Sequence, residues 1–558
     1  MTSPARLTWT ADSVPADLRD RLIGPGAPFE LVTEDVLGAP HQVFARRPRS
    51  LRQLLDTSAA ESPDLVFLVA PGREWTYQQA VEDIDAIAVL LAERYGVRAG
   101  DRVAIVSANS AEYVLVLWAV LSLGAIVTSL NGWWTGHELT AGIQLTEPVL
   151  VVGDERRLER LDDSPLPARL LTEILDESAE FRGRTTPAPD ITEDAAAVIL
   201  FTSGTTGRAK GATLSHRNVV NYALSQGLSR AIAAAGAAAT GPAGQAGRAA
   251  SIVVSPMFHV SGFVGVVISG AVFRTKLVFT EPGAWDPGRH LELTERHRIT
   301  AWSGVPTHFW RLLRHPDLAT RDVSSVIAVN SGGAVFPPEL VRALRRELPR
   351  ARLGNGYGAS ETVGLGTQAS GALFAEHPDS VGVAPPTSEV EIRGTGGAVL
   401  ADGEIGEIHL RHPSVFLGYW GEPEATAEVL GPNRWYATGD FGRIENGLLY
   451  LESRRTDLIL RGGENVYPIE IENRLIEHAG IAEAAVVGVD HPELGQEVKA
   501  FVVRAPGADG LTAEQVREWC AAALAAFKVP SRIEFRPSLP YTVSGKLLKQ
   551  QLRNEDPQ

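Results

Sequence analysis

The chain of 558 residues has a single cysteine, Cys520. A lone cysteine excludes an internal disulfide and a cysteine-based zinc site, and it is typical of proteins in a reducing cytoplasm. Positive charge is also in deficit, since 52 lysines and arginines stand against 67 aspartates and glutamates and give a formal net charge of -15. This deficit argues against nucleic acid or an anionic membrane surface as the main partner.

A secretory signal and uninterrupted membrane spans are missing as well. Residues 1–10 contain no apolar core and lead into a charged stretch. Residues 113–130 carry no charged side chain, and residues 251–273 carry none apart from His259, so both reach the length of a membrane span. A glycine interrupts the first run, and a proline and a glycine interrupt the second. We therefore expect buried pairs of a helix and a strand, no transmembrane segment and a cytoplasmic location.

The length, together with 44% apolar and 21% charged residues, predicts two or more globular domains. Predicted helices and strands alternate over residues 76–330, which indicates an α/β fold with doubly wound sheets. Short alternating strands after about residue 390 predict a small β-subdomain, and a compact α+β unit follows it. The predicted order is a leader at 1–50, a large N-terminal domain at 51–454 with an Ala/Gly-rich mobile surface insertion at about 227–250, and a C-terminal domain at 455–558.

The segment 200–212 joins a predicted strand to a run of hydroxyls, glycines and one lysine. Glycines let backbone N–H groups turn toward an anion, hydroxyl side chains donate hydrogen bonds, and the lysine adds positive charge. The residues concerned are Thr202, Ser203, Gly204, Thr205, Thr206, Gly207, Lys210 and Gly211. The segment is not a Walker A loop, because Lys210 stands between Ala209 and Gly211 rather than between a glycine and a hydroxyl. It predicts a phosphate-binding loop, with a flexible surface loop as the alternative.

Polar groups stand beside glycine in three further stretches at predicted strand ends, 356–362, 435–440 and 540–546. Together these stretches predict a nucleotide site. Tyr357 can lie on an adenine ring, and Ser360 can bond a phosphate oxygen. Glu361 offers magnesium an oxygen ligand, and Asp440 can accept hydrogen bonds from a ribose. Each residue also has an ordinary explanation as a core, helix-start or turn residue.

The order and spacing of these four stretches resemble the superfamily of adenylate-forming enzymes, which includes acyl-CoA synthetases, peptide-synthetase adenylation domains and beetle luciferase. The resemblance covers about residues 50–550 and extends to the stretches 256–262, 330–334 and 454–472. Within the superfamily, residues 131–139 and the run Gly-Gly-Glu-Asn-Val-Tyr-Pro at 462–468 are most similar to fatty or aromatic acyl-CoA synthetases. The resemblance implies an ATP- and acyl-binding N-terminal domain followed by a mobile C-terminal domain.

The resemblance implies two half-reactions. A carboxylate attacks the α-phosphate of Mg-ATP to give an acyl-adenylate and pyrophosphate, and the thiol of CoA then displaces AMP. Carried over by motif position, the catalytic residues are Lys546, Lys210, Glu361 and Ser360, and Glu361 is also the Mg²⁺ ligand. The residues implied to bind ATP are Thr202, Ser203, Gly204, Thr205, Thr206, Gly207, Gly333, Ala334, Asn355, Gly356, Tyr357, Asp440, Arg454, Gly462 and Gly463.

The same resemblance places the acyl site between the His259 segment, the 330–334 loop and the turn at 355–366. The predicted pocket residues are Phe258, His259, Phe263, Trp302, Gly332 and Gly364. The aromatic side chains favour an apolar pocket for an aliphatic or aromatic acid, whereas the glycines serve either a roomy pocket or turns. We interpret His259 as a wall or gate, since an ionised carboxylate needs no general base.

Three positions depart from the family's pattern. Thr456 stands at the hinge, where Asp or Lys is common, Ala209 replaces a proline in the phosphate loop, and Ser360 replaces the commoner threonine. None of these changes removes a group that the chemistry requires, so we expect an active acyl-CoA ligase. The alternatives are an adenylating enzyme that transfers to a carrier protein or uses an unusual substrate such as nitrite, and a non-catalytic nucleotide-binding relative. A homodimer is also left open.

Overall fold

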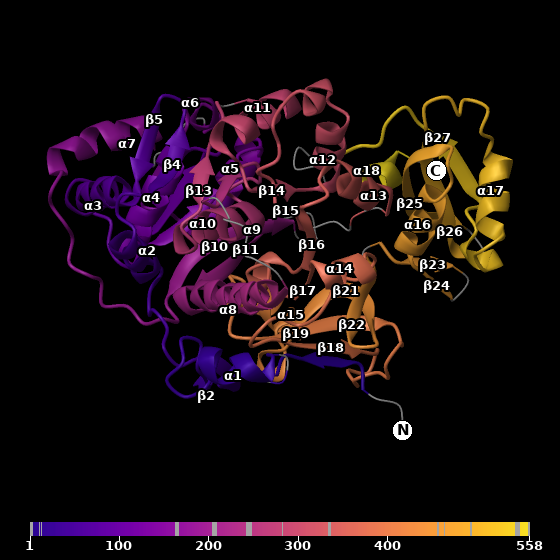
Figure 1. Cartoon of the computed structure of the whole chain (residues 1–558), viewed down its shortest axis with the longest axis horizontal. Coiled ribbons are helices and arrows are strands. Elements are labelled where there is room, and N and C mark those ends of the chain that lie inside the picture. Colours follow the sequence, from indigo (N-terminus) through magenta and orange to yellow (C-terminus); the bar gives the residue numbers. More distant parts are fainter. Residues whose placement is uncertain are drawn as a thin grey trace.

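The computed structural model describes residues 4–10, 12, 14–161, 167–203, 209–240, 248–281, 283–332, 336, 338–454, 457–461, 464–491, 494–541 and 547–555. The chain folds into a large α/β body and a smaller lobe, made by the last hundred or so residues, that stands beside it (Figure 1). This arrangement confirms the predicted fold class of a large N-terminal α/β domain followed by a small α+β domain. Among the residues that the structure describes, no helix is both long enough and apolar enough to cross a membrane.

An eight-stranded sheet forms one half of the body. Its six inner strands pair in parallel, and an antiparallel strand closes each edge. In spatial order the strands are β17 (Thr367–Ser370), β16 (Arg352–Tyr357), β15 (Ala328–Gly332), β14 (Ala301–Gly304), β12 (Ala250–Ile252), β13 (Lys276–Val278), β4 (Val66–Ala70) and β5 (Arg73–Thr76). Parallel pairing brings the carboxyl ends of β14, β15 and β16 to one edge, where ligands bind in open α/β sheets.

A seven-stranded sheet forms the other half. Its order is β20 (Gly418–Tyr419), β11 (Ala209–Ser215), β10 (Ala196–Ser203), β7 (Ile126–Ser129), β6 (Arg102–Val106), β8 (Leu150–Gly153) and β9 (Ala168–Leu170). The strands from β10 to β9 are parallel, whereas β11 and β20 run antiparallel to their neighbours. The sheet therefore ends in an antiparallel ribbon that carries the predicted phosphate loop.

Helices cover both sheets in the alternation that the sequence predicts. Helix α3 begins after Thr76, which forms a capping box with Gln79 as its spacing predicts. Every residue of α4 except Glu112 is buried, and the chain passes from α4 into β7, so the uncharged run 113–130 is a buried helix and strand. The main helices of the body are α2 (Leu51–Glu61), α3 (Tyr77–Glu93), α4 (Ala111–Ser122), α5 (Gly136–Thr146), α7 (Leu171–Ser178), α8 (His216–Thr240), α11 (Pro287–His297), α12 (Pro306–Leu313) and α13 (Pro338–Glu347).

The predicted surface insertion at 227–250 is helical over much of its length. Helix α8 continues to Thr240, and β12 begins at Ala250. Alanine has the highest helix propensity, so a run of alanines extends a helix even where glycines interrupt it. The low-complexity pattern thus forms a helix as far as Thr240, the prediction of a mobile surface insertion stays a prediction, and residues 241–247 lie outside the described part of the chain.

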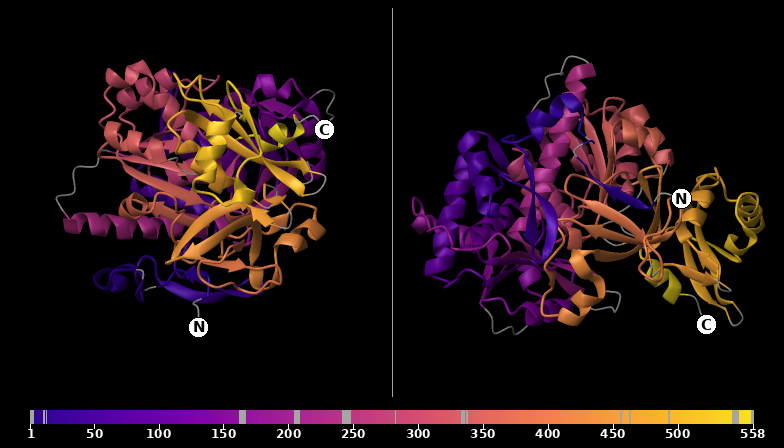
Figure 2. Two further views of the ribbon diagram at one scale, coloured as in Figure 1. Left: turned by 90° about the vertical axis from the view of Figure 1, so that its right-hand side faces the viewer. Right: turned by 90° about the horizontal axis from the view of Figure 1, so that it is seen from below.

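The predicted β-subdomain is a five-stranded sheet, and the predicted leader is part of it. The strand order is β1 (Arg6–Thr8), β18 (Glu389–Arg393), β19 (Gly406–Arg411), β21 (Tyr436–Glu445) and β22 (Leu448–Arg454). Figure 2 shows the N-terminal segment lying along this sheet. The leader also forms α1 (Ala16–Leu22) and the hairpin of β2 (Leu31–Val36) and β3 (Ala39–Phe44).

The C-terminal lobe has its own sheet and its own hydrophobic core. Its strands are β24 (Glu464–Val466), β23 (Ile459–Arg461), β26 (Gly495–Arg504), β25 (Ile481–His491) and β27 (Arg532–Phe535), and its helices are α16 (Pro468–Ile476), α17 (Ala513–Ala521) and α18 (Lys549–Asn554). Helix α17 ends at Ala521, and a short 3₁₀ turn follows at Ala526–Lys528. The lone Cys520 packs in this core.

Candidate active site

The segment 200–212 forms a β-hairpin. Strands β10 and β11 are antiparallel, and Thr202 lies opposite Lys210. The hairpin projects past the end of β7, because β10 pairs with β7 only as far as Leu200. The predicted phosphate ligands Gly204, Thr205, Thr206 and Gly207 lie outside the described residues, and so does the side chain of Ser203. The structure therefore places the two flanks of the predicted loop but not its tip.

Glu361 is buried beside this hairpin. It belongs to the 3₁₀ turn Ser360–Thr362 and is 6% exposed. Burial raises the pKa of its carboxyl above the ordinary value, and the charge of Asp440 raises it further, whereas hydrogen bonds from Tyr419 and Thr202 lower it. No cationic side chain among the described residues pairs with Glu361. A buried carboxylate without a cation is costly, so its chemistry fits a Mg²⁺ ion that also binds substrate phosphates.

Tyr419 connects Glu361 to Lys210. Its hydroxyl donates a 2.9 Å hydrogen bond to Glu361 Oε1, and Lys210 Nζ lies 4.9 Å from the centroid of its ring. Tyr436 lies near Tyr419, and burial raises the pKa of both hydroxyls. Neither tyrosine is among the site residues predicted from the sequence. Tyr436 lies within the predicted stretch 435–440, and the only local signal at Tyr419 is the glycine that precedes it.

Asp440 and Tyr357 form the other side of the site. The Tyr357 hydroxyl donates to Asp440 Oδ2 over 2.9 Å, although the residues come from different sheets. Arg454 lies opposite Asp440 in the ladder of β21 and β22, but its side chain is outside the described part. Asn355, which is 5% exposed, has a buried Nδ2 with no hydrogen-bond partner in the described part of the chain. A buried amide donor of this kind is a group that a ligand can satisfy.

The predicted acyl-pocket residues divide into two groups. Phe258 and His259 are neighbours whose ring centroids lie 4.7 Å apart, and Trp133 packs edge-on against Phe258 at 4.8 Å. Phe263 and Trp302 are fully buried in two different hydrophobic clusters, and the Trp302 indole donates to Thr294 over 3.1 Å. Both pack as core residues, so a role for them in the pocket wall stays a prediction.

The remaining predicted residues are placed only in part. Ser360 is half-buried at the start of the Glu361 turn, and Gly364 is exposed after it with a φ of 76°. Gly332 of β15 and Gly356 of β16 lie opposite each other in the parallel ladder. The predicted residues outside the described part are Gly333, Ala334, Thr456, Gly462, Gly463 and Lys546.

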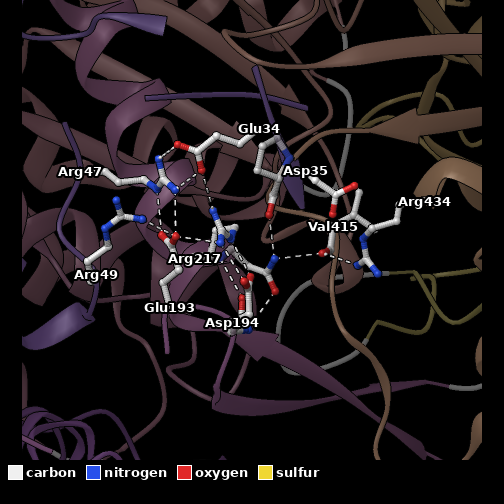
Figure 3. Close-up of polar contacts among 12 residues, drawn as sticks. Glu34, Asp35, Arg47, Arg49, Glu193, Asp194, Arg217, Val415 and Arg434 are labelled. Carbon is white, nitrogen blue, oxygen red and sulfur yellow. Dashed lines mark hydrogen bonds and ion pairs between the residues drawn. The ribbon is translucent and has the colours of Figure 1, made fainter. Parts of the chain in front are cut away.

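Buried charges fix the base of the hairpin. Glu193 and Asp194 precede β10, and Arg217 follows β11. Figure 3 shows Arg47, Arg49 and Arg217 converging on Glu193, and Arg217 also pairs with Asp194. Arg47 is 2% exposed and Arg217 is 8% exposed, so both guanidiniums depend on these carboxylates.

Arg434 holds the chain that leads to Tyr419. It donates to the carbonyls of Val415 and Phe416, and Phe416 N–H donates to the Glu361 carbonyl over 2.7 Å. Burial lowers the pKa of the Arg434 guanidinium. The loop at 415–419 is therefore anchored at one end by a guanidinium and bonded to the backbone of Glu361.

Comparisons with known proteins agree with this arrangement. Residues 55–420 match a family described as AMP-binding enzyme, and residues 470–546 match the AMP-binding enzyme C-terminal domain. A long-chain-fatty-acid CoA ligase of Bacillus subtilis is 30% identical over 91% of this chain and 95% of its own length. A feruloyl-CoA synthase of Amycolatopsis is 33% identical over 82% of this chain and 89% of its own. The structure of ATP-bound MatB from Rhodopseudomonas palustris superposes with a TM-score of 0.79, at 29% identity, over 90% of this chain and 98% of that protein.

Proposed function

Because the chain belongs to the AMP-binding enzyme family, we propose that it activates a carboxylic acid with ATP and transfers the acyl group to the thiol of CoA. The observation that carries the proposal is the meeting of three predicted nucleotide-binding stretches at one carboxylate. Burial raises the pKa of the Glu361 carboxyl, the nearby charge of Asp440 raises it further, and the Thr202 side chain lowers it. Residues 202, 361 and 440 are far apart in the sequence, so a common ligand site explains why they converge.

Lys210 and the flanks of the hairpin serve the phosphates in this proposal. During adenylation, negative charge builds up on the α-phosphate oxygens and on the departing pyrophosphate. The Lys210 ammonium and the hydroxyl of Thr202 face this charge, together with the loop residues Ser203 to Gly207. Ser360 contacts the α-phosphate. These fixed groups stabilise the transition state without reorganising.

Glu361 is the proposed magnesium ligand. A Mg²⁺ ion bound there would neutralise phosphate charge and orient the polyphosphate chain. One buried carboxylate suffices, because Mg²⁺ in nucleotide sites is usually held by one or two carboxylates plus the substrate phosphates. Tyr419 and Thr202 orient the carboxylate through their hydrogen bonds.

Tyr357 and Asp440 are proposed to hold the nucleoside. The Tyr357 hydroxyl fixes Asp440, whose carboxylate can accept hydrogen bonds from the ribose hydroxyls. Gly333, Ala334 and Gly356 border the adenine, and Arg454 adds a charge beside the ribose. The Asn355 amide, which has no hydrogen-bond partner among the described residues, offers a donor to the same ligand.

The C-terminal lobe is proposed to supply Lys546, which bridges the carboxylate and the α-phosphate. For the second half-reaction the lobe turns at Thr456 and brings Gly462 and Gly463 toward the CoA thiol. The domain limits at residues 50 and 454 belong to this proposal. An intracellular location and a homodimer are further parts of it.

We propose an apolar acid, aliphatic or aromatic, as the substrate. The packed rings of Trp133, Phe258 and His259 support an apolar wall. The names of the relatives, a long-chain-fatty-acid ligase and a feruloyl-CoA synthase, support both classes. A carrier-protein thiol is the alternative acceptor to CoA.

The test is to incubate the protein with ATP, Mg²⁺, CoA and pooled carboxylic acids and to identify products by mass spectrometry. We expect AMP, pyrophosphate and one or more acyl-CoA thioesters. The variant Lys546→Ala should lose ATP–pyrophosphate exchange by a factor of about 100 or more but still convert a supplied acyl-adenylate to the thioester. Adenylate without thioester would favour a carrier-protein acceptor, and the absence of both products for every acid would refute the proposal.

A further inference from the structure

One side chain, Tyr419, touches both a cation and an anion of the proposed active site. Lys210 Nζ lies over the face of its ring, 4.9 Å from the centroid. At the opposite end of the ring, the hydroxyl donates to Glu361 Oε1 over 2.9 Å. The ring face attracts a cation through its quadrupole, and the hydroxyl solvates a carboxylate. Each of the two charges therefore has a weak neutral partner.

Lys210 and Glu361 do not pair with each other. Within the described ranges, neither residue has an oppositely charged side chain at ion-pair distance. Such a pair would be favoured here, because Glu361 is almost completely buried and Coulomb attraction grows as the local dielectric falls. Tyr419 instead contacts both groups, with the ammonium over its ring face and the carboxylate at its hydroxyl.

Tyr419 is itself held firmly. Its backbone lies opposite Ala212 in the ladder of β20 and β11, and its N–H donates to Thr426 Oγ1 over 2.9 Å. The ring of Phe416 packs edge-on against its ring at 5.0 Å. A side chain anchored from the backbone to the hydroxyl cannot swing away to let the charges meet.

We propose that Tyr419 is a positioning residue that acts as a spacer, keeping Lys210 and Glu361 from forming an ion pair that ATP would have to break. This inference rests on the proposed function, since it assigns Lys210 to the phosphates and Glu361 to the metal. With the spacer, the ammonium stays available to the phosphates before the nucleotide arrives. A site organised in advance loses less binding energy to rearrangement.

The test measures binding of ATP in the presence of EDTA by calorimetry, so that Lys210 contributes but metal binding at Glu361 does not. Tyr419→Leu removes the spacer and lets Lys210 pair with Glu361. ATP would then have to break this partly buried ion pair, which should weaken its binding about fivefold to tenfold. Tyr419→Phe keeps the ring and should bind ATP within about twofold of the original protein. Tyr450→Leu is the matched control, because it removes a ring that lies under the Arg443 guanidinium at 4.7 Å, away from the site.

The decisive step is to add Glu361→Gln. In the original background this change should improve metal-free ATP binding slightly, because it removes one negative charge. In the Tyr419→Leu background it should restore the lost affinity, because it also releases Lys210. An equal effect in both backgrounds would overturn the spacer, and so would a Tyr419→Phe variant as weak as Tyr419→Leu. Binding of ATP only with Mg²⁺ would overturn the spacer, and binding neither in EDTA nor with Mg²⁺ would refute the proposed function itself.

Discussion

Replacing Glu193 by alanine removes the carboxylate on which the arginines at the base of the hairpin converge. Glu193 is 10% exposed and accepts from Arg47 Nε at 2.8 Å and from Arg217 at 2.7 Å. Deleting one partner of a buried ion pair usually costs about 3–5 kcal/mol, because the other charge stays buried. Here Arg47 keeps Glu34 and Arg217 keeps Asp194. We therefore expect Glu193→Ala to lower the free energy of unfolding by about 2–3 kcal/mol.

The assay is urea unfolding of the full chain, followed by tryptophan fluorescence and far-UV circular dichroism. The matched control is Glu180→Ala, which removes a carboxylate bonded to Arg94 on the surface, where the two side chains are 66% and 40% exposed. We expect no measurable shift for this control, since solvent screens an exposed pair. If Glu193→Ala shifted the midpoint no more than Glu180→Ala does, the buried charges would not hold the hairpin in the way we infer.

Two further outcomes follow from shifted pKa values. Burial raises the pKa of Glu193, but hydrogen bonds and charges from arginines outweigh it and hold the pKa below its ordinary value of 4.5. The stabilisation is therefore present above that pH and is lost as pH falls through the folded value. The stability difference between the original protein and Glu193→Ala should therefore shrink in urea titrations as pH falls below the ordinary value, and a constant difference would contradict this. Burial raises the pKa of Cys520 to about 11, so a thiol reagent should label the native protein slowly and the urea-unfolded protein quickly. Equally fast labelling of both would show that the C-terminal core opens readily.

The sequence was sufficient for the architecture because periodic patterns and caps are local signals. Thr76 and Gln79 predicted where α3 begins, and the uncharged run at 113–130 was correctly divided into a helix and a strand. The alanine-rich segment was harder, because glycine and alanine together resemble a flexible linker. Helix α8 continues through it to Thr240 because the alanines favour helix more than the glycines oppose it.

The residues of the proposed active site that could be predicted are those that lie in short contiguous motifs. Glu361, Asp440 and Tyr357 were singled out from such motifs, and the fold brings them together. Tyr419 was missed because it acts through contacts with residues far away in the sequence. Its hydroxyl reaches Glu361, 58 residues earlier, and its ring reaches Lys210 on the neighbouring strand. Pairings of this kind depend on the register of β20 against β11, which local patterns do not specify.

The leader is better understood as a structural part of the proposed ATP site than as a wrapping segment. Arg47 lies in the predicted leader, yet its guanidinium is 2% exposed and bonds to Glu193 at the start of the phosphate hairpin. Arg47 also donates a hydrogen bond to Glu34 of β2, so the β2–β3 hairpin belongs to the same cluster of buried charges. Losing an acceptor leaves part of a buried guanidinium without a partner, which is costly. A guanidinium that joins two segments of the chain therefore resists movement of either segment. The first 50 residues thus restrain the base of the loop that we propose receives the pyrophosphate, although they contain none of the residues proposed to touch ATP.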